Sequence, residues 1–169
     1  MSELEHAKRR SILFICMGNI CRSPLAEGVF LHLARKRGIA DRFEVDSAGT
    51  GGWHAGEPPD PRATAVAEKH GVVLVSRARR VDPARDFSRF EYLIAMDRLN
   101  LRELKRLGAP EKQLHLLRRF DPATAGLPDT ALEVPDPYYG GPDGFDAVFE
   151  MVRAACNGLL DKLSGRDGS

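Results

Sequence analysis

The sequence is poor in cysteine and has no apolar run long enough to cross a membrane. Its three cysteines stand at positions 16, 21 and 156, an odd number whose spacing fits neither a disulfide framework nor a metal cluster. The N-terminal residues MSELEHAKRR are highly charged and the apolar run after them is short, so we expect neither a signal peptide nor a membrane helix. These absences favour the cytoplasm, where thiols stay reduced.

An excess of charge of either sign is also missing. The 25 Lys and Arg residues and the 24 Asp and Glu residues give a formal net charge of +1, which offers no argument for a nucleic acid or a membrane surface as a partner. No repeat, low-complexity tract or long linker divides the 169 residues. We therefore expect a single domain over 1–169, with flexible tails at 1–10 and 164–169.

Strand-like and helix-like segments alternate along the chain. Strands are predicted at 11–16, 43–48, 91–96 and 112–117. Helices are predicted to begin at Pro24, at Pro61 after the cap residue Asp60, after Asp97 and at about Asp143. The segment VVLV at 72–75 fits either a short strand or a buried loop. The alternation predicts an α/β fold, a three-layer sandwich in which helices cover both faces of a parallel sheet.

The most informative segment is 12–23, which reads ILFICMGNICRS. Five residues separate Cys16 from Arg22, enough for a loop whose backbone N–H groups point inward at a tetrahedral oxyanion. Gly18 lets the backbone turn, and the planar guanidinium of Arg22 can hold two phosphate oxygens at once. The spacing predicts a phosphate-binding loop with a nucleophile inside it, made of Cys16, Met17, Gly18, Asn19, Ile20, Cys21, Arg22 and Ser23.

Cys16 must be a thiolate to attack, and a free thiol titrates near ~8.5. The loop amides, Arg22, Ser23 and the N-terminus of the helix that starts at Pro24 all favour the charged sulfur, so a thiolate is expected at neutral pH. Most lone cysteines are small buried hydrophobic residues. The full constellation instead favours an enzyme that handles phosphate.

A thiolate nucleophile cannot protonate the group that it displaces, so a carboxylic acid must come from elsewhere in the chain. Asp121, Asp129, Asp136 and Asp143 all lie in loop-like sequence and are all candidates. The residue patterns alone leave this choice open.

The segment CMGNICRSP at 16–24 resembles the signature loop of the low-molecular-weight protein tyrosine phosphatases. Further segments resemble that family in the same order, namely DSAGT at 46–50, HGVVLVSRAR at 70–79, AMD at 95–97 and DPYYGG at 136–141. The resemblance implies a flavodoxin-like strand order, 2-1-3-4, and hydrolysis of phosphotyrosine in protein substrates, with neither metal nor cofactor. It also selects Asp136 as the proton donor.

The implied reaction has two steps. Cys16 attacks phosphorus while Asp136 protonates the leaving phenolate, and water then hydrolyses the cysteinyl phosphate with Asp136 as the base. Arg22 and the loop amides stabilise both transition states. An apolar and aromatic slot deep enough for a phenyl ring, and too deep for phosphoserine, is expected from Ile20, Trp53, Tyr138 and Tyr139.

Three alternatives follow from the same resemblance. Arginine phosphatases of the superfamily carry threonine at the position of Ile20, so the isoleucine favours phosphotyrosine over phosphoarginine. Thioredoxin-linked arsenate reductases need a further pair of cysteines near residues 80–90, where VDPARDFSRFEY has none. A phosphopeptide-binding module without activity would typically lack the cysteine, the arginine or the acid.

Supporting roles are implied for Asn19, Ser23 and Ser47, which would hold the loop in shape. Many family members carry histidine at the position of Ser76. Cys21 is expected to trap the oxidised form of Cys16 as a disulfide, whereas Cys156 fits the core of a helix. Arginine clusters at 77–80 and 118–119 are either solvated surface or help to steer an acidic phosphopeptide, and a monomer or weak homodimer is expected.

Overall fold

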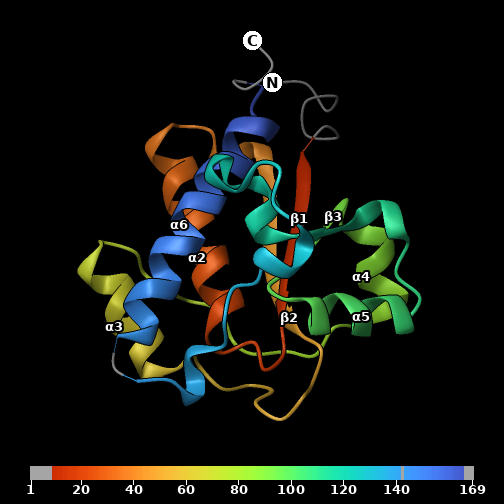
Figure 1. Ribbon diagram of the computed structural model, residues 1–169, viewed down its shortest axis with the longest axis horizontal. Helices are drawn as coiled ribbons and strands as arrows, with labels where there is room; N and C mark the ends of the chain where they lie inside the picture. The colour runs from red at the N-terminus through yellow and green to blue at the C-terminus, as the bar shows by residue number, and fades with distance from the viewer. Residues whose placement is uncertain (1–8, 142, 166–169) are drawn as a thin grey trace.

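The structure, a computed structural model, describes residues 9–141 and 143–165, with only the backbone of Tyr139. Its sheet has four parallel strands in the order β2-β1-β3-β4 (Figure 1). This arrangement confirms the predicted strand order, 2-1-3-4. The strands are β1 (Arg10–Cys16), β2 (Phe43–Gly49), β3 (Tyr92–Ala95) and β4 (Leu114–Leu116).

Five α-helices and six short 3₁₀ helices connect or follow these strands in the described residues. The α-helices are α2 (Arg22–Lys36), α3 (Pro61–Lys69), α4 (Pro83–Arg89), α5 (Arg98–Arg106) and α6 (Gly144–Leu163). The 3₁₀ helices are η1 (Ala40–Arg42), η2 (Glu111–Gln113), η3 (Leu117–Phe120), η4 (Pro122–Thr124), η5 (Asp129–Ala131) and η6 (Pro137–Tyr139).

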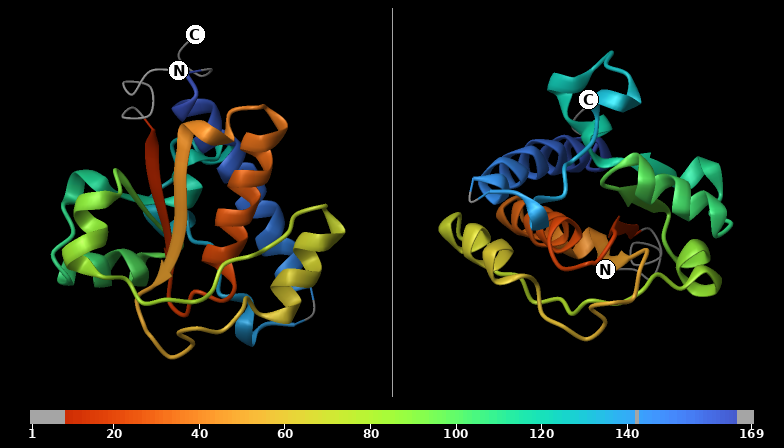
Figure 2. Two further views of the ribbon diagram at one scale, coloured as in Figure 1. Left: turned by 180° about the vertical axis from the view of Figure 1, so that it is seen from behind. Right: turned by 60° about the horizontal axis from the view of Figure 1, so that its bottom comes forward.

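The sheet separates two apolar clusters, because successive side chains of a strand point to opposite faces. Ile12 and Phe14 of β1 pack with α2, α3 and α6 on one face. Leu13 and Ile15 pack with α4 and α5 on the other face. Figures 1 and 2 show these two helical layers on either side of the strands, which confirms the three-layer sandwich.

The helix starts agree with the sequence signals in most places. The Asp60 carboxylate accepts a hydrogen bond from the Arg62 N–H (2.8 Å) at the start of α3, and the Asp97 carboxylate accepts one from the Asn100 N–H (2.8 Å) at the start of α5. Helix α2 begins at Arg22, two residues before the proline that was expected to start it. Helix α4 was not predicted, because seven residues are too few for a clear apolar periodicity.

One strand prediction needs correction, and the structure decides the open assignment at 72–75. The expected strand at 112–117 is reduced to β4, because η2 and η3 occupy the residues on either side of it. The segment 72–75 is a loop, in which Val72 is buried while Val73 and Val75 are exposed. Arg10 begins β1 although it was assigned to a flexible tail, and Ser164 forms the C-cap of α6. The tail residues 1–8 and 166–169 lie outside the described residues.

The carboxyl end of β1 is where the loops gather. The loop after β1, the loop at 50–60 after β2 and the segment around η6 lie together at the bottom of Figure 1, and the right-hand view of Figure 2 brings them forward. Ligands of parallel α/β sheets bind at this end of the strands.

Candidate active site

Cys16 is the last residue of β1, and its side chain lies at the centre of the loop that joins β1 to α2. The Asn19 N–H donates a hydrogen bond to Sγ (3.3 Å), and Ser23 Oγ lies 3.0 Å from the same sulfur. Asn19 has a left-handed backbone with φ of 58°, which turns its N–H inward. A backbone N–H and a hydroxyl thus both lie within hydrogen-bond distance of the sulfur.

Arg22 begins α2, and its guanidinium is almost completely buried beside the loop. Its Nη1 donates to Asp97 Oδ2 (2.7 Å) and to the Val134 carbonyl oxygen (2.9 Å). Burial alone would lower the pKa of the guanidinium, but the Cys16 sulfur and the Asp97 and Asp136 carboxylates raise it above its ordinary value. The arginine is therefore held as a fixed cation at the mouth of the loop.

Asp136 approaches Arg22 from a distant part of the chain. Its Oδ2 lies 3.7 Å from Arg22 Nη2, and its Oδ1 accepts a hydrogen bond from the Tyr138 N–H (3.0 Å) at the start of η6. Of the four aspartates that the sequence left open, Asp136 is the one that lines the cleft over Cys16. Asp121 instead caps η4, and Asp129 pairs with Arg119 (2.6 Å).

The cleft over Cys16 has a volume of about 300 Å³. Two of its walls come from Trp53, in the loop after β2, and from Tyr138 in η6. His54 is a lining residue that the sequence did not predict, because only the fold brings its ring beside the loop glycine. The cleft is lined by Cys16, Met17, Gly18, Ile20, Cys21, Arg22, Trp53, His54, Asp136 and Tyr138. The predicted role of Tyr139 rests on a side chain outside the described residues.

The loop after β2 is fixed directly to the loop between β1 and α2. The Thr50 N–H donates to the Cys16 carbonyl oxygen (2.9 Å), and the Gly51 N–H donates to that of Met17 (3.0 Å). The indole of Trp53 lies on Gly51, where a Cβ would come within 1.7 Å of the ring. Glycine at position 51 is therefore required for this placement of the tryptophan wall.

A brace connects the loop to the segment that carries Asp136. The Asp60 N–H donates to the Ile20 carbonyl oxygen (2.8 Å), and the Asp60 carboxylate pairs with Arg62 (2.9 Å). The Arg62 guanidinium in turn donates to the Tyr138 carbonyl oxygen (3.3 Å) and lies 5.3 Å from the centroid of that tyrosine's ring. The wall formed by Tyr138 is thus held relative to the loop between β1 and α2.

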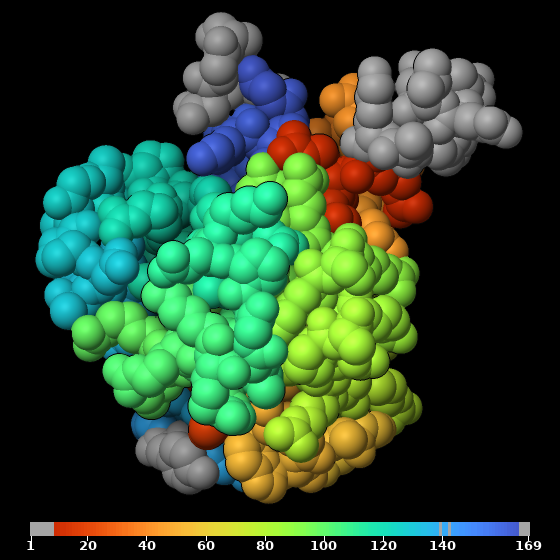
Figure 3. All heavy atoms as spheres, turned by 90° about the vertical axis from the view of Figure 1, so that its right-hand side faces the viewer, coloured from red at the N-terminus to blue at the C-terminus, as the bar shows by residue number. Residues whose placement is uncertain are grey.

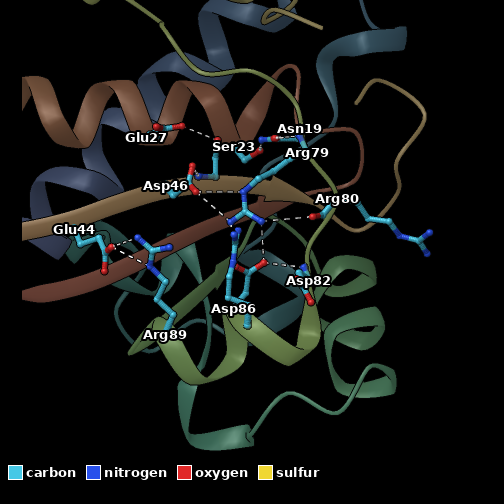
Figure 4. A network of polar contacts seen from close by, with 12 residues as sticks. Asn19, Ser23, Glu27, Glu44, Asp46, Arg79, Arg80, Asp82, Asp86 and Arg89 are labelled. Carbon is cyan, nitrogen blue, oxygen red and sulfur yellow. Dashed lines mark hydrogen bonds and ion pairs between the residues drawn. The ribbon is translucent and has the colours of Figure 1, made fainter. Parts of the chain in front are cut away.

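Behind the loop, Asn19 connects the site to a network of ion pairs (Figure 4). Its Nδ2 donates to Ser23 Oγ (2.7 Å), and its Oδ1 accepts from the Arg79 N–H (3.0 Å). The Arg79 guanidinium binds Asp46 (3.1 Å) and the buried Asp86 (2.9 Å). No local pattern in the sequence predicts this network, which only the fold assembles.

Ser47, which was expected to help hold the loop in shape, contacts α2. Its hydroxyl donates to Glu27 Oε1 (2.6 Å), because β2 places it beside α2. Burial raises the pKa of the Glu27 carboxyl, although hydrogen bonds from the Ser47 and Ser76 hydroxyls oppose the rise. The Ser76 hydroxyl is therefore a hydrogen-bond partner of the Glu27 carboxyl.

The remaining cysteines are both buried. Cys21 lines the cleft, and burial together with the Asp60 carboxylate raises the pKa of its thiol. Cys156 packs inside α6 with its Sγ 3.6 Å from the Ala26 carbonyl oxygen, as expected for a core residue.

Neither a metal-binding cluster nor a membrane-spanning helix is found in the described part of the chain. No group of three or more His, Cys, Asp or Glu side chains there could hold a metal ion. None of the described helices has both the length and the apolar character needed to cross a membrane.

Residues 11–167 match the family model of the low molecular weight phosphotyrosine protein phosphatases. A low molecular weight protein-tyrosine-phosphatase of Streptomyces coelicolor is 49% identical over 162 residues, 92% of this chain and 96% of that protein. A crystal structure of a protein tyrosine phosphatase from Entamoeba histolytica is 36% identical, with a TM-score of 0.83 over 94% of this chain and 99% of that one. A Drosophila arginine phosphatase is 32% identical, with a TM-score of 0.79 over 90% of this chain and 96% of that one.

Proposed function

This chain belongs to the low molecular weight phosphotyrosine protein phosphatase family, and we propose that it hydrolyses phosphotyrosine in proteins through a cysteinyl-phosphate intermediate. The observation that carries the proposal is the convergence on one cleft of Cys16 and Arg22, at the two ends of the loop between β1 and α2, with Asp136 from the distant segment before η6. A nucleophile, a fixed cation and a carboxyl group are the three parts that this reaction needs.

The first step forms a sulfur–phosphorus bond and breaks the bond between phosphorus and the phenolic oxygen. The Cys16 thiolate supplies the electron pair, and the Asp136 carboxyl gives its proton to the leaving phenolate. Arg22 and the inward loop amides hold the equatorial oxygens, on which charge develops. Because Asp97 already fixes the guanidinium at 2.7 Å, little reorganisation is needed in the transition state.

The second step releases inorganic phosphate. Water attacks the phosphorus of the cysteinyl phosphate, Asp136 takes the proton of that water, and the thiolate leaves with the electron pair. The hydroxyl of Ser23, 3.0 Å from Sγ, stabilises the departing charge. Each group thereby returns to its starting state, and the cycle consumes one water for each phosphate.

The walls of the cleft support an aromatic substrate. Trp53 and Tyr138 face a space that can take a phenyl ring, while the nucleophile lies at its base. The phosphoserine side chain is shorter. Its phosphorus would reach Cys16 only if the peptide backbone entered the space between these two rings. Phosphotyrosine is therefore the substrate that best fits the depth of the cleft.

Phosphoarginine is the second candidate substrate, because the Drosophila relative is an arginine phosphatase. Ile20 argues against it, since this side chain lines the cleft where arginine phosphatases carry threonine. Parallel assays on phosphotyrosine and phosphoarginine peptides would decide between them. We expect Ile20→Thr to lower the ratio of kcat/KM for the phosphotyrosine peptide to kcat/KM for the phosphoarginine peptide. If the parent enzyme prefers the phosphoarginine peptide, phosphoarginine becomes the assigned substrate.

Turnover of p-nitrophenyl phosphate and of a phosphotyrosine peptide tests the proposal. Cys16→Ser should abolish both activities while the far-UV circular dichroism stays unchanged. Cys156→Ser makes the same substitution at a cysteine remote from the cleft and should retain activity. Activity in the Cys16→Ser protein would contradict the assigned nucleophile.

Phosphoproteins are the substrates that the family implies. We propose that the enzyme acts in the cytoplasm, because a reducing compartment keeps a catalytic thiol free. A monomer or a weak homodimer is the assembly that we propose, and light scattering across a concentration series measures it.

A further inference from the structure

A second groove, larger and more open, adjoins the catalytic cleft. Its volume is about 820 Å³, and it lies between the loop after β2, Arg80 and one face of α5. Met17 and Trp53 line both the groove and the cleft, so the two are continuous. Figure 3 shows this side of the molecule, with α5 in green above the gold loop at 50–53 and red atoms of the loop after β1 visible nearby.

The groove face of α5 carries Leu99, Arg102, Glu103 and Arg106, which share one side of the helix because of their i, i+3, i+4 and i+7 spacing. Leu104 points to the opposite side and is buried in the core. This helix therefore presents a mixed apolar and basic face to the groove while its other face anchors it to the sheet.

Positive charge dominates the groove. Among the residues that the structure describes, Arg80, Arg102 and Arg106 line it together with a single carboxylate, that of Glu103. Glu103 already pairs with Arg106, through Nε at 2.9 Å. Within the described ranges, no carboxylate lies at ion-pair distance from Arg80 or Arg102, and both side chains are exposed. Two guanidinium groups are thus available to a ligand.

Exposed apolar side chains accompany this charge. Leu99 is 66% exposed, Trp53 70% and Met17 41%. Large exposed apolar side chains beside arginines are typical of surfaces that bind other proteins. The three residues lie along the path from the groove to the nucleophile's loop, so a ligand in the groove would contact a ligand in the cleft.

We infer that this groove binds the acidic polypeptide segment beside the phosphotyrosine of a protein substrate, an inference that rests on the proposed function. Carboxylates of the segment pair with Arg80 and Arg102, and an apolar side chain packs on Leu99 and Trp53. An extended segment advances about 3.3 Å per residue, so a few residues suffice to continue from the cleft into the groove. The enzyme thereby prefers phosphotyrosines that have acidic neighbours in the substrate sequence, while the two chemical steps stay the same.

The test uses a pair of phosphotyrosine peptides that differ only in their flanking residues, one with Asp and Glu and the other with Asn and Gln. The variant is Arg80→Gln/Arg102→Gln. The matched control is Arg35→Gln/Arg42→Gln, which removes the same charge from exposed positions at the opposite end of the sheet. We expect the variant to lower kcat/KM for the acidic peptide about fivefold at low salt, and less at high salt.

The same variant should leave kcat/KM for the neutral peptide and for p-nitrophenyl phosphate unchanged. Equal losses on both peptides, an equal loss in the control, or no loss at all would overturn the assignment of the groove. If the parent enzyme hydrolyses both peptides equally well and the variant behaves like the parent, the groove proposal is wrong and the proposed function still stands. If the parent enzyme hydrolyses neither peptide, both the proposed function and the groove proposal are wrong.

Discussion

We expect Asp86→Ala to lower the free energy of unfolding by about 3 kcal/mol. The Asp86 side chain is fully buried and accepts hydrogen bonds from Arg79 Nη1 (2.9 Å), Arg79 Nη2 (3.2 Å) and the Asp82 N–H (2.7 Å) (Figure 4). Removing one partner of a buried ion pair costs about 3–5 kcal/mol. The lower end applies here, because Arg79 keeps its second partner, Asp46, at 3.1 Å.

Urea unfolding followed by circular dichroism measures this change. Asp46→Ala is the matched control, because it removes the other carboxylate from the same arginine at a site where the aspartate side chain is 40% exposed. Exposed pairs contribute about 0–1 kcal/mol, so the control should lose less than about 1 kcal/mol. Equal losses in the two variants, or a loss below about 1 kcal/mol for Asp86→Ala, would refute the reasoning.

The contribution of Asp86 also has a defined dependence on pH. Burial alone would raise the pKa of its carboxyl, but Arg79 and the Asp82 N–H lower it below its ordinary value. A lowered pKa stabilises the folded state above the unfolded pKa of about 3.9, and this stabilisation is lost as pH falls through the folded value. The difference between the parent and Asp86→Ala should therefore be constant near neutral pH and shrink below about pH 4.

Three further predictions concern the cleft. Asp136→Ala should lower kcat about a hundredfold for phenyl phosphates with poor leaving groups and much less for p-nitrophenyl phosphate; equal losses would contradict its role as the acid. Cys21→Ser should recover less activity than the parent when dithiothreitol follows peroxide, because the disulfide that protects Cys16 cannot form; full recovery would end that role. Gly51→Ala should raise KM for aryl phosphates severalfold by displacing the Trp53 indole, whereas Gly52→Ala, whose Cβ would lie 3.5 Å from the nearest atom of Arg80, should leave KM unchanged.

The loop around Cys16 could be predicted from the sequence because all of its parts are local. Cys16, Gly18 and Arg22 lie within one short segment, so their spacing alone predicts a phosphate-binding loop. The strand order and Asp136 came from the family resemblance and not from the residue patterns, which left four aspartates open. Asp136 comes close to Arg22 only because the intervening strands and helices fold as they do.

Other parts of the site had no local signal. Asp97 was placed as the residue before a helix, and nothing in its neighbourhood indicated that it would also fix Arg22 at 2.7 Å. The same holds for the contact between Asn19 and the Arg79 N–H, which joins residues 60 positions apart. Helix α4 did carry a signal, since Asp82 and Pro83 form a typical helix start, but its short length concealed it.

The phosphoenzyme itself tests the central claim most directly. The reaction with p-nitrophenyl phosphate is quenched with acid during the first turnovers, and the peptide that carries Cys16 is examined by mass spectrometry. We predict the added mass of one phosphoryl group on Cys16 in the parent protein and none on the Cys16→Ser protein. Continued turnover with an unmodified Cys16, or a phosphoryl group on another residue, would contradict the proposed mechanism.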